Sequence, residues 1–328
     1  MMLAGEFSRN VPSADKRIKI GFVSSLDALA VMQGDGTASS SSLNDGGDSS
    51  QKWSPVSCQA YSNIVHQLLN GTLQGGLVPF DLFAVNLLAQ PQQYRRWAVL
   101  GVHVRCSWEF LAAHHAHRWL GKVSEGKRHA SAMGEFRIAM AGCHPIVKRR
   151  IDRWMKKHHG DDVQLSYHVL PVKLMRRAIE SGAMDAVALP APWGHAAQFD
   201  GLGMVEPTLE QNGWDLGMLL VVDRDAVENL PLFFKQMKAF VSHAADHTKK
   251  MSDVEIARHV LRRDLFGNVS EEIMLQAASA AAASQPIVFD VPPEHLSSRL
   301  TLLTEFGILN TVASPAHEVA AAMLNGLK

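Results

Sequence analysis

Five short segments of the sequence place residues that can bind a small polar group at points where a helix is expected to begin. Each segment follows an expected strand. The first backbone N–H groups of a helix have no partner within it and carry a partial positive charge, so a group of such segments suits a small anion. The side chains of His144 and Trp193 add ring N–H donors. The candidate binding residues are Ser25, Ser57, Cys58, Gln59, Pro79, Gly142, Cys143, His144 and Trp193.

Two other groups of residues suggest chemistry, and both have a simpler interpretation. Cys143 and His144 are a potential nucleophile and base, but adjacent residues rarely face each other, so no catalytic residue is expected. The histidines of the segment HHAH, residues 114–117, have no carboxylate or cysteine nearby that completes a four-ligand metal site. We therefore expect an exposed helix face there, and neither a metal nor a cofactor.

Strands and helices alternate along most of the chain, which is typical of an α/β protein with mostly parallel strands. Residues 18–23 (IKIGFV) and 136–141 (FRIAMA) are expected to be strands, each followed by the start of a helix. Residues 107–121 (SWEFLAAHHAHRWLG) are expected to be helical. The polar segment 122–134 is a candidate connection between two lobes, and the chain beyond residue 230 is expected to be mainly helical.

Two segments, LLNGTLQGGLVPFDL and AIESGAMDAVALPAPW, share one layout. In each, an amphipathic helix ends at a glycine, a short apolar strand follows, and a proline precedes an apolar helix start. Eight residues separate Gly71 from Pro79, and eight separate Gly182 from Pro190. This repeat predicts two similar lobes, and ligands of such sheets bind beyond the carboxyl ends of the strands. Trp193 is then either a wall of the ligand site or a core residue of one lobe.

These patterns divide the chain into two lobes and two segments without structure. Residues 1–15 are expected to be a disordered N-terminus. Residues 33–52 are expected to be a disordered loop, because their many Gly, Ser and Asp residues cannot bury apolar surface. Lobe I is expected to comprise residues 16–130 and 223–328, and lobe II residues 131–222.

The composition favours a soluble protein without a dedicated nucleic-acid partner. The 328 residues are 47% hydrophobic and 20% charged. Lys and Arg number 32, as do Asp and Glu, whereas proteins that bind nucleic acid directly usually have a basic surplus. The sequence has neither a signal-peptide pattern nor an apolar run long enough to span a membrane. We expect no membrane insertion and a cytoplasmic location, or a periplasmic one if the start of the chain is misassigned.

Four segments, in this order, resemble the nitrate- and bicarbonate-binding solute receptors of ABC transporters and their cytoplasmic relatives, the nitrate/nitrite sensors. They are IKIGFVSSLDA, VSCQAYSNIVHQLLNGTLQGGLVPFDL, GAMDAVALPAPWGHAAQFDGLG and GMLLVVDRDAVENLPLFFKQMKAFV, and they span most of residues 18–245. The resemblance implies a two-lobed, periplasmic-binding-protein-like fold of the second type (type II). It also implies an oxyanion held between lobes that close about a hinge. The implied ligand contacts lie near Ser57 and Cys58, at Gly142 to His144, and at Trp193. Cys58 stands where the family often has a tryptophan.

The resemblance also implies partners, and it leaves the exact role open. The ligand would be nitrate, nitrite or bicarbonate, and the protein would act without catalysis, with either an RNA-binding antiterminator or an ABC permease as its partner. One alternative is an enzyme on the same fold, of the chorismate dehydratase or pyrimidine-synthase kind. The dense cysteine motif of the pyrimidine synthases is absent from the sequence. Another alternative is a degenerate binding fold that serves as a protein-interaction module.

Overall fold

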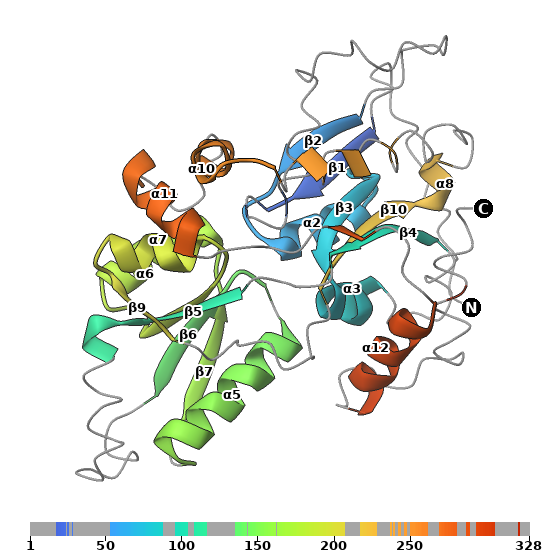
Figure 1. Cartoon of the computed structure of the whole chain (residues 1–328). Coiled ribbons are helices and arrows are strands. Elements are labelled where there is room, and N and C mark those ends of the chain that lie inside the picture. Colours follow the sequence, from blue (N-terminus) through green and yellow to red (C-terminus); the bar gives the residue numbers. More distant parts are fainter. Residues whose placement is uncertain are drawn as a thin grey trace.

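Two β-sheets lie side by side and form the framework of the chain in the computed structural model (Figure 1). The predicted segments 1–15, 33–52 and 122–134 lie outside the residues that the structure describes. The described residues are 18–23, 25, 28, 53–87, 96–103, 108–116, 135–142, 144–161, 163–206, 217–227, 237, 239, 242–243, 246–247, 250–261, 269–280, 287–288, 293–305 and 321.

The first sheet has the strand order β11-β4-β10-β3-β1-β2, and the second has the order β7-β6-β8-β5-β9. The strands of the first sheet are β1 (Ile18–Phe22), β2 (Trp53–Ser57), β3 (Gly75–Pro79), β4 (Trp97–His103), β10 (Met218–Asp223) and β11 (Ile287–Val288). Those of the second are β5 (Trp108–Ala113), β6 (Phe136–Met140), β7 (Leu165–Val169), β8 (Ala186–Pro190) and β9 (Gly203–Glu206).

Helices flank both sheets. We call the first sheet with α2 (Tyr61–Leu69) and α3 (Phe80–Leu87) the first lobe. The second lobe is the second sheet with α5 (Pro145–His159), α6 (Val172–Glu180) and α7 (Trp193–Phe199). The C-terminal part of the chain adds α8 (Arg224–Val227), α10 (Asp253–Leu261), α11 (Glu271–Ala280) and α12 (Pro293–Glu305).

Both sheets are built to the same plan. In the first, β1 pairs in parallel with β2 and β3; in the second, β6 pairs in parallel with β7 and β8. Next to these strands lies an antiparallel one, β10 beside β3 and β5 beside β8. On its other edge, β10 pairs with β4 and β5 pairs with β9, again antiparallel. The sheets are therefore mixed, and the predicted two-lobed α/β architecture is confirmed.

The repeated layout found in the sequence recurs in backbone geometry. Gly71 and Gly182 end α2 and α6 with φ angles of 75° and 69°, in the left-handed region that glycine tolerates best. Just beyond them, Leu73 N donates to Gln67 O, and Met184 N donates to Ala178 O in the same way. Each turn leads directly into the buried strand that the sequence predicted, β3 or β8.

The helix expected over residues 107–121 is wrong for residues 108–113, whereas residues 114–116 are helical and residues 107 and 117–121 lie outside the described part of the chain. Residues Trp108–Ala113 form β5, and all of them are buried. A short apolar run does not distinguish a buried helix from a strand with both faces covered, so periodicity misleads here. Pairing decides the outcome, because β5 is hydrogen-bonded to β8 on one edge and to β9 on the other.

The sheets also divide the chain at points other than those expected. β5 belongs to the second sheet although residues 16–130 were expected in lobe I. β10 belongs to the first sheet, although all but its last residue lies within 131–222, the range expected for lobe II. The chain passes from the first sheet to the second between β4 and β5 and returns between β9 and β10, so both boundaries lie earlier in the sequence than expected.

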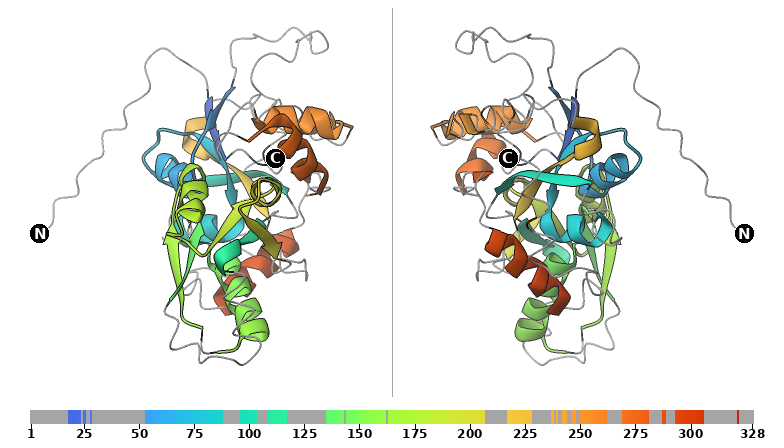
Figure 2. Two further views of the ribbon diagram at one scale, coloured as in Figure 1. Left: turned by 90° about the vertical axis from the view of Figure 1, so that its left-hand side faces the viewer. Right: turned by 90° about the vertical axis from the view of Figure 1, so that its right-hand side faces the viewer.

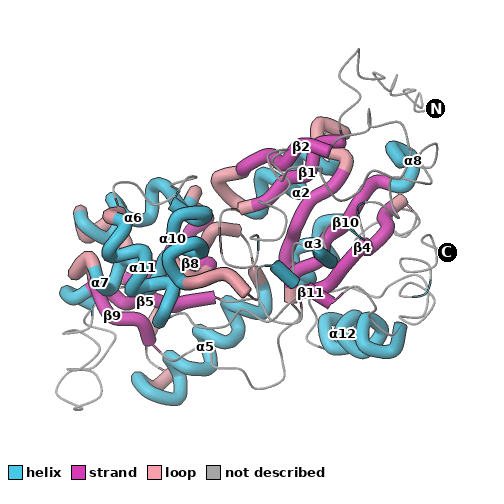
Figure 3. Tube along the Cα trace, turned by 45° about the horizontal axis from the view of Figure 1, so that its top comes forward, coloured by secondary structure: helices cyan, strands magenta, loops and turns pink. Residues whose placement is uncertain are grey.

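The C-terminal helices are shared between the lobes rather than belonging to lobe I alone. α11 packs against α7 of the second lobe, and α10 packs against α11. Figure 3 shows α10 and α11 over the second sheet, with α12 near the first. In the side views of Figure 2, α10 and α11 lie on the side of the molecule opposite to α2.

Two glycine substitutions should separate backbone strain from steric overlap. Gly182 has open space around the position of a Cβ atom, so Gly182→Ala should lower the free energy of unfolding only by the left-handed backbone cost, about 1 kcal/mol. At Gly203, a Cβ atom would lie 2.1 Å from the backbone oxygen of Ala112. Gly203→Ala should therefore cost about 3 kcal/mol, because β9 must move away from β5. Urea unfolding measures both, and equal losses would contradict this assignment.

Candidate ligand-binding site

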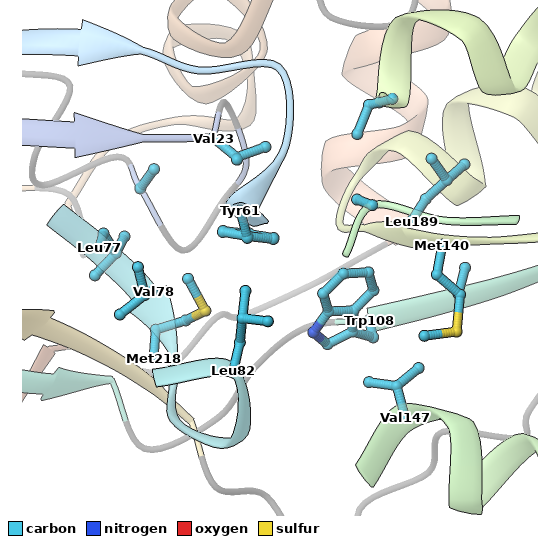
Figure 4. Packing of buried hydrophobic residues seen from close by; sticks show 14 of the residues in the cluster. Val23, Tyr61, Leu77, Val78, Leu82, Trp108, Met140, Val147, Leu189 and Met218 are labelled. Atoms are coloured by element: carbon cyan, nitrogen blue, oxygen red, sulfur yellow. The ribbon is translucent and has the colours of Figure 1, made fainter. Parts of the chain in front are cut away.

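The carboxyl ends of the parallel strands and the starts of the following helices face each other between the lobes. Figure 4 shows Tyr61 and Leu82 of the first lobe opposite Trp108 and Val147 of the second. Tyr61 begins α2, Leu82 lies in the first turn of α3, and Trp108 is the first residue of β5. All four side chains are buried, so the facing surfaces of the two lobes are apolar and aromatic near these residues.

His144 lies in contact with an aromatic ring from each lobe. Its ring centroid is 4.4 Å from that of Trp108 and 5.7 Å from that of Tyr61, and the Tyr61 and Trp108 centroids are 5.8 Å apart. The His144 side chain is fully buried at the N-cap position of α5. These three rings, which we call the aromatic cluster, therefore connect the two lobes.

Neither ring nitrogen of His144 has a hydrogen-bond partner among the described residues. Nδ1 lies 3.6 Å from Oδ1 of Asp81, and Nε2 faces Gly142, where a Cβ atom would lie 2.8 Å from it. Glycine at position 142 thus leaves the space that the ring occupies. Burying polar atoms without partners costs free energy, so this imidazole marks a place where a polar ligand group would be stabilising.

Asp81 connects the first lobe to the N-terminus of α5. Its Oδ2 accepts a hydrogen bond of 3.2 Å from the backbone N–H of Ile146, and its Oδ1 accepts one of 2.8 Å from Leu82 N. Asp81 is 4% exposed. A negative charge is stabilised at a helix N-terminus, and a carboxylate is therefore well placed there.

Oxygen atoms of the protein also occupy the first turns of the two other helices of the second lobe. At α6, Val172 N donates to the backbone oxygen of Gln59 in the first lobe, at 3.3 Å. At α7, His195 N donates to Oε2 of Glu109, at 3.0 Å. The expectation of free helix N–H donors was therefore too simple, because internal oxygens already accept from one such N–H in each of α5, α6 and α7.

Glu109 and His195 form a second buried polar pair, within the second lobe. Oε1 of Glu109 lies 2.6 Å from Nδ1 of His195, and this hydrogen bond raises the pKa of His195 above its ordinary value of 6.5. A Cβ atom on Gly194 would overlap Glu109, so glycine is needed where α7 approaches β5. The pair stabilises the start of α7 against β5.

The structure brings only some of the predicted site residues together. Gly142 and His144 are in contact and lie between the lobes. Cys143 lies outside the described residues. Ser25 is buried, and its hydroxyl donates to the backbone oxygen of Val23. Pro79 is buried at the end of β3, opposite Met218 of β10.

The segment 57–59 contributes through its backbone rather than through its side chains. Ser57 and Gln59 are exposed, and Gln59 takes part through its carbonyl oxygen. Cys58 is buried, and its thiol receives a hydrogen bond from Gln67. Burial raises the pKa of the Cys58 thiol to about 11, so it stays neutral and is a poor nucleophile.

Trp193 is fully buried at the first position of α7, which packs against β5, β8 and α11. This burial among packed elements is what the core role of Trp193 predicts. The tryptophan of the aromatic cluster is Trp108 of β5 and not Trp193.

Sequence reasoning missed four residues of this region: Tyr61, Asp81, Trp108 and Glu109. A signal for Asp81 was available, because an acidic residue in the first turn of an expected helix often interacts with a helix N-terminus. Trp108 and Glu109 were hidden by the wrong assignment of β5 as a helix. The partner of Glu109, His195, is 86 residues away in the sequence, and nothing local points to it.

Within the described ranges, no three His, Cys, Asp or Glu side chains come together in a way that could hold a metal ion. None of the described helices is both long enough and apolar enough to cross a membrane.

Comparisons with known proteins identify the architecture. No family model matches the sequence, and no curated protein matches it. Among solved structures, the periplasmic nitrate-binding protein NrtA from Synechocystis PCC 6803 is 14% identical, with a TM-score of 0.70 over 97% of this chain and 88% of that one. The chain has a periplasmic-binding-protein-like fold. The type II architecture that the resemblance implied is thus confirmed for the fold, and at this identity the likeness shows the fold alone.

Two further structures support the same conclusion. The alkanesulfonate-binding protein SsuA from Xanthomonas axonopodis pv. citri, bound to MOPS, is 14% identical, with a TM-score of 0.65 over 94% of this chain and 99% of that one. The ligand-binding component of an ABC-type import system from Staphylococcus aureus, with zinc bound, is 13% identical, with a TM-score of 0.64 over 92% and 94%. The likeness covers both lobes of this periplasmic-binding-protein-like chain.

The pair Glu109 and His195 should make stability depend on pH. The raised pKa of His195 means that its contribution is fully present below pH 6.5 and is lost as the pH rises through the higher folded-state value. Glu109→Gln keeps an oxygen that can accept from His195 N but removes the charge. The substitution should lower the free energy of unfolding by about 1–2 kcal/mol at mildly acidic pH and by less at alkaline pH.

Urea unfolding at two pH values measures this difference. Glu180→Gln is the matched control, because Glu180 is an exposed carboxylate that pairs with Arg176 of the same helix, so the substitution should cost little at either pH. A loss for Glu109→Gln that is the same at both pH values would exclude His195 as the titrating partner.

Proposed function

We propose that this chain is a two-lobed solute-binding protein whose ligand contacts His144 between the lobes. One observation carries the proposal: a fully buried imidazole has two ring nitrogens without hydrogen-bond partners among the described residues and lies between Tyr61 and Trp108. The likeness in fold to proteins that are binding proteins by name supports it.

The proposed ligand is a small oxyanion, with nitrate, nitrite and bicarbonate as the candidates. An imidazole carries a ring N–H that can donate to an anion, and the N-terminus of α5 adds positive potential beside it. The tight packing of the aromatic cluster favours a ligand of a few atoms. The nitrate-binding protein NrtA, with which the chain shares its fold, supports the same class of ligand.

The proposed role is that of a receptor without catalysis. Two contexts fit: a cytoplasmic nitrate/nitrite sensor with an RNA-binding antiterminator as its partner, or a solute receptor that delivers its ligand to an ABC permease. One observation supports this for the candidate nucleophile Cys58, whose thiol has a raised pKa and accepts a hydrogen bond from Gln67.

A titration of the full chain with nitrate, nitrite, bicarbonate and acetate, followed by calorimetry, tests this proposal. At least one of the oxyanions should bind and raise the unfolding temperature, because a ligand of the native state stabilises it by mass action. His144→Ala should weaken that binding roughly tenfold or more, since a charge-assisted hydrogen bond is lost. His66→Ala is the control, because His66 is an exposed residue of α2. No binding of any of these anions at millimolar concentration would refute the proposal.

A protein-interaction module is the second candidate. One observation favours it: Asp81 and Gln59 of the first lobe already accept hydrogen bonds from helix N-termini of the second lobe, with no ligand needed to join them. Such a module would show no change in stability with any of the anions, and His144→Ala would alter stability alone.

A further inference from the structure

We infer that Asp81 makes the proposed site selective for an oxyanion that carries its own proton, so that bicarbonate is preferred to nitrate and nitrite. The inference rests on the proposed function and deepens it, because it distinguishes between the three candidate ligands. It starts from the position of one buried carboxylate beside the unpartnered ring of His144.

Asp81 occupies the place where an anion would otherwise bind. Its Oδ2 accepts from Ile146 N, in the first turn of α5. Pro145 has no N–H, and Lys148 N donates to the backbone oxygen of His144, at 2.9 Å. An oxyanion at this helix N-terminus would therefore compete with Asp81 for Ile146 N and would lie close to its carboxylate.

The same carboxylate lies close to the proposed ligand contact. Its Oδ1 is 3.6 Å from Nδ1 of His144, and the Asp81 side chain is almost fully buried. A ligand that binds beside His144 therefore meets a negative charge in surroundings with little water. Two like charges repel strongly there, unless a proton between them forms a hydrogen bond.

This requirement separates the three candidates by their chemistry. Bicarbonate carries a hydroxyl group that can donate to Asp81, while its other oxygens accept from His144. Nitrate and nitrite have oxygen acceptors only, so each would place an acceptor against a carboxylate. A buried site built to accept a ligand's O–H group discriminates strongly against an analogue that lacks it, because its own polar group stays unpaired.

The aromatic cluster is consistent with this selectivity. Tyr61 and Trp108 cover the His144 ring from the two lobes. Water is therefore a poor substitute for the missing donor of nitrate.

The experiment compares the dissociation constants of bicarbonate, nitrate and nitrite by calorimetry, at one pH at which bicarbonate is the main carbonate species. The wild-type chain should bind bicarbonate roughly tenfold or more tightly than nitrate, because nitrate leaves Asp81 unpaired. Asp81→Asn has nearly the same shape, but its amide can donate to nitrate. In this variant the preference for bicarbonate should fall roughly tenfold or be reversed.

Asp161→Asn is the matched control. It also removes one negative charge, but Asp161 is exposed beyond the C-terminus of α5 and pairs with Lys156. Its ratio of affinities should equal that of the wild type. Circular dichroism shows whether each variant folds. If Asp81→Asn does not fold, the ratio of the nitrate and bicarbonate dissociation constants of the wild type still tests the inference.

The outcomes distinguish a failure of the selectivity for bicarbonate from a failure of the proposed function as an anion receptor. Nitrate binding as tight as, or tighter than, bicarbonate binding in the wild type overturns the selectivity and leaves the anion receptor standing. An unchanged ratio in a folded Asp81→Asn variant does the same. Binding of none of the anions to the wild type overturns both.

Discussion

β5 and β10 are each hydrogen-bonded to neighbours on both edges, and each completes the sheet of the lobe opposite to the strand that precedes it. β5 follows β4 of the first sheet, and β10 follows β9 of the second. Because the chain passes from the first sheet to the second between β4 and β5, Trp108 and Glu109 are the first two residues of the strand that follows this crossing. The aromatic cluster and the contact with α7 both depend on that placement.

The polar atoms between the lobes follow from this arrangement. Helix N-termini of the second lobe meet acceptors that come from the first lobe or from β5: the carboxylate of Asp81, the carbonyl oxygen of Gln59 and the carboxylate of Glu109. Each acceptor removes the cost of a buried N–H group. Together they reduce the positive potential available to a ligand, and this is the basis of the proposed preference for an oxyanion that carries its own proton.

Much of the fold could be predicted because local interactions determine it. Short segments of the sequence predicted the glycine turns at Gly71 and Gly182, the apolar strands that follow them and the prolines that end those strands. The structure has each of these features. The error at β5 has the opposite origin. Its apolar run fits a buried helix or a buried strand equally well, and only pairing with β8 and β9 selects the strand.

The sequence alone determined the alternation of strands and helices, the repeat that makes two lobes, and the position of Gly142 and His144 before a helix. Only the tertiary structure decided which side chains surround that histidine. Asp81 and the N-terminus of α5 are 65 residues apart, and Glu109 and His195 are 86 apart. Periodicity and turn propensity act over a few residues, whereas contacts of this kind depend on how whole sheets pack and on where the chain crosses from one sheet to the other. The sequence therefore indicated Gly142 and His144 as candidates, but it did not indicate the residues that surround them in the structure.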